Sequence, residues 1–128
     1  MTNDTIKVLI IDDEAPLRRL TARMLGPNYA VAESGTAGEA LQQVSGENYD
    51  LLLVDHSLPD MNGNELVQRI RSAHPDQKVI YISGHARETC LRPEELDDPA
   101  TGFIQKPFTR DQLRHTVDVL HGSTPSNE

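Results

Sequence analysis

The sequence lacks several features that would place it in particular protein classes. Its single cysteine, Cys90, cannot form a disulfide within the chain, which suits a reducing compartment. No apolar run approaches the roughly 20 residues that a membrane-spanning helix needs, and residues 1–5 are too few and too polar for a secretory signal. No glycine-rich phosphate loop, of either the P-loop or the dinucleotide type, is present. We therefore expect a cytoplasmic protein without a membrane segment.

Basic residues are also scarce, with 12 Lys and Arg against 20 Asp and Glu and a net charge of −8. This balance argues against a basic face for nucleic acid and against an anionic membrane surface as partners. The 128 residues can bury a core as one domain without disulfides or a structural metal. We expect that domain over residues 1–121, followed by a flexible polar tail over residues 122–128.

Apolar runs and helically spaced apolar residues alternate along the chain. The expected strands cover residues 7–11, 29–32, 51–54, 79–82 and 103–104. The expected helices cover residues 15–25 and 63–73, and two more begin after Thr36 and Thr109, each of which has Glu or Gln three residues later as in a capping box. This alternation favours an α/β fold with a doubly wound parallel sheet and helices on both faces.

The interval between residues 85 and 102 fits this alternation poorly. A helix is expected there, yet the interval holds Pro93, Pro99 and a run of acidic residues. Only residues 87–91 are free of helix-breaking residues. We therefore expect the fourth helix to be short or irregular.

Chemically active side chains fall where the expected strands end. Right-handed crossovers place the carboxyl ends of parallel strands on one edge of the sheet, and open α/β sheets bind their ligands at that edge. The residues at this edge are Asp12 and Asp13 after the first strand, Asp55 after the third, Ser83 after the fourth and Lys106 after the fifth.

Three carboxylates at one point repel each other, since two unit charges ~4 Å apart at an effective dielectric constant near 20 cost about 4 kcal/mol. Such a cluster needs a cation or a proton. Oxygen ligands alone favour a hard metal that keeps its waters, so Mg²⁺ is expected and Mn²⁺ is possible. A divalent metal, the Lys106 ammonium and the Ser83 hydroxyl together suit phosphoryl oxygens. Asp55 is then a candidate nucleophile that forms an acyl phosphate.

Each of these residues, taken alone, also has a purely structural interpretation. Asp13 could cap the first helix, Asp55 and Ser83 could be turn residues, Lys106 could be an ordinary surface lysine, and Phe103 could belong to the core. Their coincidence at successive strand ends on one edge favours a functional site over these interpretations.

Four segments carry a resemblance to a known family: VLIIDDE (8–14), LLLVDHSLPDMNG (51–63), YISG (81–84) and FIQKPF (103–108). Together they resemble the receiver domain of two-component response regulators, over residues 7–120. The resemblance implies a flavodoxin-like (βα)5 fold whose five-stranded parallel sheet has the order 2-1-3-4-5. The segment GFIQKPFT also resembles receivers attached to hybrid sensor histidine kinases, and the sequence does not decide between such a domain and a free-standing regulator.

The resemblance also implies roles for the residues at the strand ends. Asp55 matches the phosphoacceptor, and Asp12 and Asp13 match the acidic pair that holds Mg²⁺ together with Asp55 and the backbone carbonyl of Ser57. Ser83 matches the hydroxyl that bonds the phosphoryl group and stands where threonine is commoner.

The remaining matches lie after the fourth strand. Lys106 matches the lysine that pairs with the phosphoryl group, and the bond from Lys106 to Pro107 matches a cis peptide. Phe103 matches the aromatic residue that, with Ser83, forms the family's switch, although it carries no hydroxyl.

The expected function is therefore Mg²⁺-dependent transfer of a phosphoryl group to Asp55 from the phosphohistidine of a sensor histidine kinase or a histidine phosphotransfer protein. Phosphorylation would then switch the surface of the fourth helix, fifth strand and last helix, with output by protein contact or onward relay.

We expect a monomer or a weak phosphorylation-dependent dimer. We expect no enzyme beyond self-catalysed phosphotransfer and slow autodephosphorylation. A metal-dependent phosphohydrolase with an aspartyl nucleophile, and a flavin- or nucleotide-binding module of similar fold, are the weaker alternatives.

Overall fold

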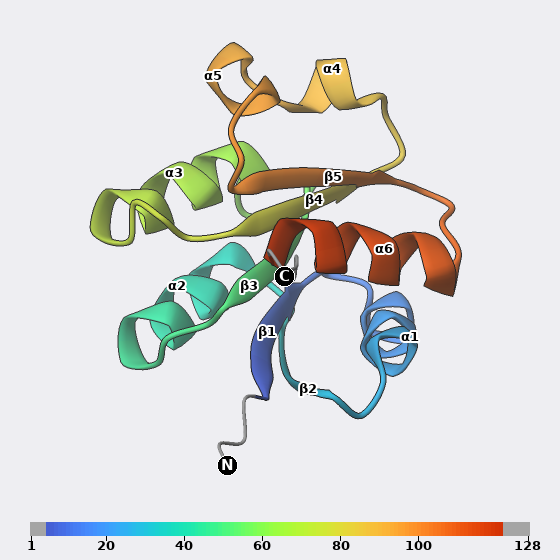
Figure 1. Ribbon diagram of the computed structural model, residues 1–128. Helices are drawn as coiled ribbons and strands as arrows, with labels where there is room; N and C mark the ends of the chain where they lie inside the picture. The colour runs from blue at the N-terminus through green and yellow to red at the C-terminus, as the bar shows by residue number, and fades with distance from the viewer. Residues whose placement is uncertain (1–4, 122–128) are drawn as a thin grey trace, which may run out of the picture.

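The computed structural model describes residues 5–121, so the predicted tail at 122–128 lies outside the described residues. Its strands are β1 (Ile6–Ile11), β2 (Tyr29–Ser34), β3 (Leu51–Asp55), β4 (Val79–Ser83) and β5 (Thr101–Gln105). They form one sheet in the order β2-β1-β3-β4-β5 (Figure 1), and every neighbouring pair is parallel. The predicted doubly wound parallel sheet and its strand order are confirmed.

Within residues 5–121, six helical segments connect and cover the strands. They are α1 (Ala15–Leu25), α2 (Ala37–Gly46), α3 (Gly63–Ala73), α4 (Arg87–Cys90), α5 (Pro93–Leu96) and α6 (Arg110–His121). Figure 1 shows α1 and α6 on one side of the sheet and α2 and α3 on the other. Alternate side chains of β1 point to opposite faces of the sheet. Leu9 and Ile11 pack toward α2 and α3, and Val8 and Ile10 pack toward α1 and α6.

The amino-acid composition of each strand matches its central or edge position in the sheet. All five residues of β3 and all five of β4 are buried, as expected for strands covered on both faces. In β2, by contrast, only Ser34 is fully buried, which fits the edge position that its more polar sequence predicts.

Side-chain hydrogen bonds cap the helices α2 and α6 at their predicted amino-terminal ends. The Thr109 hydroxyl accepts from Gln112 N at 3.1 Å and Gln112 Oε1 accepts from Thr109 N at 2.8 Å, a complete capping box. At α2 the Thr36 hydroxyl accepts from Glu39 N at 3.1 Å, but the Glu39 carboxylate reaches one residue further, to Gly35 N.

The fourth helix is replaced by two helical segments of four residues each, α4 and α5, as the breakers in this interval predict. Pro93 occupies the first position of α5, where its missing N–H leaves no bond unmade. Cys90 and Leu91 are buried against the α2–α3 layer and hold the segment to the sheet. No helix within residues 5–121 is long and apolar enough to cross a bilayer.

Candidate functional site

The structure brings the predicted strand-end residues together at one edge of the sheet. Asp12 directly follows β1, Asp55 and Ser83 are the last residues of β3 and β4, and Lys106 directly follows β5. Carboxylate oxygens of Asp12, Asp13 and Asp55 all lie within 4.8 Å of one another. The Lys106 ammonium nitrogen lies 3.7 Å from Asp55 Oδ2. The structure therefore places at one edge the strand-end residues that the sequence analysis expected there.

The surroundings of the Asp12 carboxylate disfavour its ionised form. Asp12 is 5% exposed, and its Oδ1 accepts from Glu14 N at 2.9 Å. Burial, and then repulsion by Asp55 and Asp13, raise the pKa of Asp12 to about 6, although the Glu14 N–H and the Lys106 charge act in the opposite direction. An oxygen-only donor set with excess negative charge fits a divalent hard cation such as Mg²⁺.

Asp13 belongs to this cluster and does not cap a helix. Glu14 is the residue before the first turn of α1, and no side chain accepts a capping bond there. Asp13 itself is exposed to solvent. The capping interpretation of Asp13 is thus wrong, and its carboxylate remains available to a cation.

The two oxygens of Asp55 have different surroundings. Oδ1 accepts from the backbone N–H of Ser57 at 3.0 Å, whereas Oδ2 faces the Lys106 ammonium. The residue is 6% exposed, so this carboxylate is held in place from both sides. Ser57 is exposed just beyond it, and the role of its backbone carbonyl as a metal ligand stays a prediction.

Ser83 and Lys106 are tied to each other by the backbone. The Lys106 N–H donates to the Ser83 carbonyl at 2.7 Å, and the peptide bond from Lys106 to Pro107 is cis. The Ser83 hydroxyl, in a residue only 3% exposed, accepts from His85 N at 3.0 Å. The loops after β4 and β5 are therefore fixed relative to each other beside Asp55.

Phe103 lies in β5, in register with Tyr81 of β4. It is partly buried and packs against the core layer on the α2–α3 side of the sheet. Its role as a switch residue stays a prediction.

Two features of the site were not predicted from the sequence. Asp60, in the loop after β3, accepts from the first two backbone N–H groups of α2, those of Ala37 and Gly38, each at 3.0 Å. These bonds lower the pKa of Asp60. The second feature is a buried carboxylate, Glu95, in hydrogen-bonding contact with Asn64 of α3. Helix starts and loop acids are visible in a sequence, but which acid meets which helix is not.

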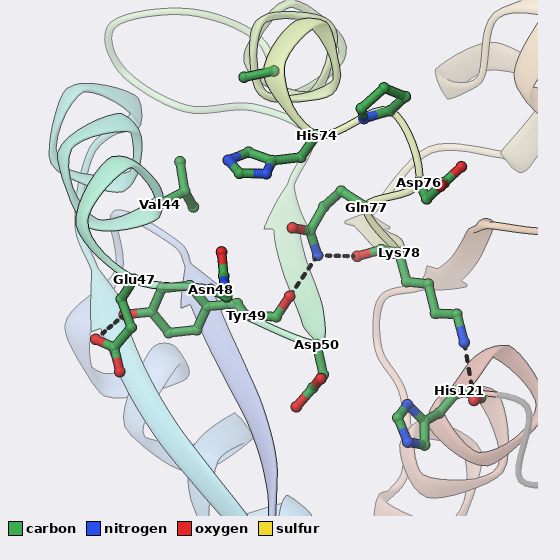
Figure 2. Close-up of a pocket in the computed structure, with 12 residues that line it drawn as sticks. Val44, Glu47, Asn48, Tyr49, Asp50, His74, Asp76, Gln77, Lys78 and His121 are labelled. Atoms are coloured by element: carbon green, nitrogen blue, oxygen red, sulfur yellow. Dashed lines mark hydrogen bonds between the residues drawn. The ribbon is translucent and has the colours of Figure 1, made fainter.

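A cavity of about 450 Å³ opens at the opposite, amino-terminal edge of the sheet. Figure 2 shows hydrogen bonds among several of its lining residues: the Gln77 amide donates to the Tyr49 and Lys78 carbonyls, and the Lys78 ammonium donates to the His121 carbonyl. These bonds hold the end of α6 against the segments that precede β3 and β4. The cavity lies at the opposite edge of the sheet from the carboxylate cluster.

Comparison with known proteins assigns the family. A sequence model of the response regulator receiver domain matches residues 8–118. The chain belongs to the response regulator receiver domain family. It is 35% identical over 116 residues to the sensor kinase CckA of Brucella abortus, an alignment that covers 88% of this chain and 12% of that protein. The chain thus spans only a small part of this relative.

Solved receiver domains have the same fold. A CheY-like receiver domain protein from Methanospirillum hungatei is 30% identical with a TM-score of 0.74, covering 90% of this chain and 92% of that one. The chemotaxis response regulator CheY4 of Vibrio cholerae has a TM-score of 0.81 at 26% identity, covering 91% and 98% of the two chains.

Membership in the family carries a general activity. Receiver domains of two-component systems are switches that accept a phosphoryl group on an aspartate, bind Mg²⁺ at an acidic pocket and interact with histidine kinases or phosphotransfer proteins. In this chain, Asp12, Asp13 and Asp55 form a cluster of carboxylates at the edge of the sheet.

Proposed function

We propose that Asp55 is the phosphoacceptor of this receiver and that its donor is the phosphohistidine of a sensor histidine kinase or a histidine phosphotransfer protein. In the transfer, the P–N bond breaks, its electron pair stays on the imidazole nitrogen, and a carboxylate oxygen of Asp55 forms the new P–O bond. The observation that carries the proposal is the position of Asp55, between two further carboxylates and the Lys106 ammonium 3.7 Å away.

Asp12, Asp13, Asp55 and the Ser57 carbonyl would hold Mg²⁺, or Mn²⁺ in its place. When bound, the ion neutralises negative charge on the phosphoryl oxygens. The raised pKa of Asp12 supports this assignment, because a carboxylate that resists ionisation gains most from a cation.

The Lys106 ammonium would pair with the phosphoryl group once it is on Asp55, and the Ser83 hydroxyl would donate to it. For this the hydroxyl can keep its bond from His85 N, since an oxygen that accepts one bond still has a proton to donate. These two groups lie on neighbouring strands, so both reach the same side of Asp55.

Phosphorylation would add a charge of about −1.5 to −2 and favour the arrangement in which Ser83 and Phe103 move toward the site. The surface that changes would comprise α4, α5, β5 and α6, and output would follow by protein contact or onward relay. We further propose a monomer or weak phosphorylation-dependent dimer in the cytoplasm, where a lone buried thiol such as Cys90 stays reduced.

The test is phosphoryl incorporation from purified histidine kinases and phosphotransfer proteins, with and without Mg²⁺. Asp55→Asn should abolish incorporation, and Asp76→Asn, an exposed acid at the far edge of the sheet, should leave it unchanged. Stable incorporation into the Asp55→Asn protein would refute the assignment. Back-transfer from the labelled protein to a phosphotransfer protein would distinguish relay from a terminal output.

A further inference from the structure

Glu95 of α5 is a buried carboxylate, 7% exposed, that no step of the proposed function uses. Its Oε1 accepts from Asn64 Nδ2 at 3.0 Å and from Arg92 N at 3.0 Å, and its Oε2 accepts from the Tyr81 hydroxyl at 2.6 Å. The Arg71 guanidinium lies 3.8 Å away. Burying a carboxylate is costly unless donors surround it. The three donors therefore hold the Glu95 carboxylate in one position.

The bonds of Glu95 orient a second residue, Asn64 at the start of α3. An ionised carboxylate only accepts, so the amide NH₂ of Asn64 must face Glu95. The amide oxygen of Asn64 then faces His56 Nε2 at 2.6 Å, and this nitrogen must carry the proton. A directed chain of hydrogen bonds therefore runs from His56, the residue after Asp55, through Asn64 to Glu95.

The loop between β3 and α3 is thereby held at two places. On one side Asp60 binds the first N–H groups of α2. On the other, His56 is bound through Asn64 to Glu95, and its ring also packs edge-on against Tyr81, with 6.2 Å between ring centroids. The bond from Asn64 to Glu95 spans 31 residues of sequence and joins the start of α3, directly after the loop, to the α4–α5 segment.

We propose that Asn64 and Glu95 form a brace, the Asn64–Glu95 brace, that holds the loop after Asp55 ready for the phosphoryl group and couples occupancy of that site to α5. The inference rests on the proposed function of Asp55. Asn64 and Glu95 are positioning residues, because they act on the site through His56 and do not touch the reacting atoms.

The physical basis is preorganisation. A loop that is already fixed loses less conformational entropy when the metal and phosphoryl group bind, so cutting the brace should weaken binding. Coupling is reciprocal, so a ligand that fixes the loop must also stabilise α5 through the same bonds. Because α5 is only four residues long, its own backbone bonds hold it weakly and its order depends on such side-chain contacts.

The experiment measures binding of Mg²⁺ with beryllofluoride, an analogue of the phosphoryl group, by calorimetry, and amide hydrogen exchange over residues 93–98 by mass spectrometry. In the wild-type protein the ligand should slow exchange in α5. Asn64→Ala should weaken binding by roughly 2- to 30-fold and abolish the response of α5. Gln68→Ala, an exposed amide one turn further along α3, is the matched control and should behave as wild type.

Glu95→Ala gives a second, independent measurement should Asn64→Ala fail to fold, with its exposed neighbour Glu94→Ala as control. Alanine removes both carboxylate oxygens, so the amide of Asn64 loses its partner in α5, and weaker binding and a lost α5 response are again expected. Binding by the wild-type protein, together with an unchanged affinity and α5 response in a folded brace variant, overturns the brace alone. Failure of the wild-type protein to bind overturns the proposed function, and the brace with it.

Discussion

The Lys106 ammonium nitrogen lies 3.7 Å from Oδ2 of Asp55, and the Asp55 carboxylate is in turn within 4.8 Å of carboxylate oxygens of Asp12 and Asp13. Asp55 is 6% exposed, so this pair is not an ordinary surface ion pair. One cation therefore acts on three anions, and its removal should affect metal and phosphoryl binding in opposite directions.

Lys106→Met should raise the affinity for Mg²⁺ while abolishing retention of the phosphoryl group. Removing a positive charge beside the cluster strengthens its attraction for a divalent cation by about 1 kcal/mol, or roughly fivefold. Calorimetric titration with Mg²⁺ measures this change. Lys78→Met, at the far edge of the sheet, serves as the control and should leave the Mg²⁺ affinity unchanged. Weaker Mg²⁺ binding in Lys106→Met would contradict the electrostatic account.

The stabilisation by Mg²⁺ should depend on pH through Asp12. Its pKa is raised from 3.8 to about 6 by burial and by the neighbouring acids, so without metal the fold favours the neutral carboxyl. That contribution to stability is fully present below about pH 4 and is lost as the pH rises through about 6. Mg²⁺ needs the ionised form, so its gain in Tm should be larger at pH 7.5 than at pH 5.

Thermal melts with MgCl₂ and with a chelator measure this difference. In Asp12→Asn the loss of stability between pH 4 and 6 that Asp12 causes should disappear, and the gain in Tm from Mg²⁺ should fall sharply. An equal gain from Mg²⁺ at both pH values in the wild-type protein would show that Asp12 does not ligate the ion.

The local part of this site could be predicted from the sequence, and its long-range part could not. Asp12, Asp55 and Ser83 each end an apolar run, and parallel topology alone places such residues on one edge. Glu95, in contrast, lies within an acidic stretch that resembles a solvated surface, and its burial depends on Asn64 and Tyr81, which are distant in sequence. A single sequence does not reveal such contacts.

The strand boundaries show the same division. The fifth strand was expected at residues 103–104 but covers Thr101–Gln105, because Thr101 and Gly102 pair in register with Val79 and Ile80 of β4. Glycine is depleted in strands, so Gly102 interrupts the signal of the strand-favouring Thr101, and pairing with the neighbouring strand supplies the rest.

Tyr81→Phe should lower the free energy of unfolding by about 1–3 kcal/mol, because it leaves one oxygen of the buried Glu95 without its hydroxyl donor. Tyr49→Phe is the control. The Tyr49 hydroxyl makes a long bond of 3.4 Å to Glu47, and its loss should cost under about 0.5 kcal/mol. Urea denaturation of both variants measures the difference, and equal losses would show that the Tyr81–Glu95 bond has no special weight.

Gly63→Ala should destabilise the protein by about 1–3 kcal/mol. A Cβ at Gly63 would lie 3.1 Å from the carbonyl oxygen of Asp55 and from His56 Cα, backbone atoms that cannot move aside freely. Gly46→Ala at the end of α2 meets nothing within 4 Å and should stabilise the fold by up to about 1 kcal/mol. Denaturation curves of the two variants should therefore shift in opposite directions. An unchanged stability of Gly63→Ala would mean that the backbone at Asp55 and His56 can move to make room for the added methyl group.

The order in which the chain supplies the site has a consequence for its synthesis. All three carboxylates lie within the first 55 residues, whereas Ser83 and Lys106 arrive with the last two strands. A nascent chain that has completed only β1 to β3 carries the mutual repulsion of the acids without the lysine that offsets it. Such a chain lacks the hydroxyl and the ammonium group that we propose pair with the phosphoryl group, so under the proposed function we expect transfer only after β5 has docked.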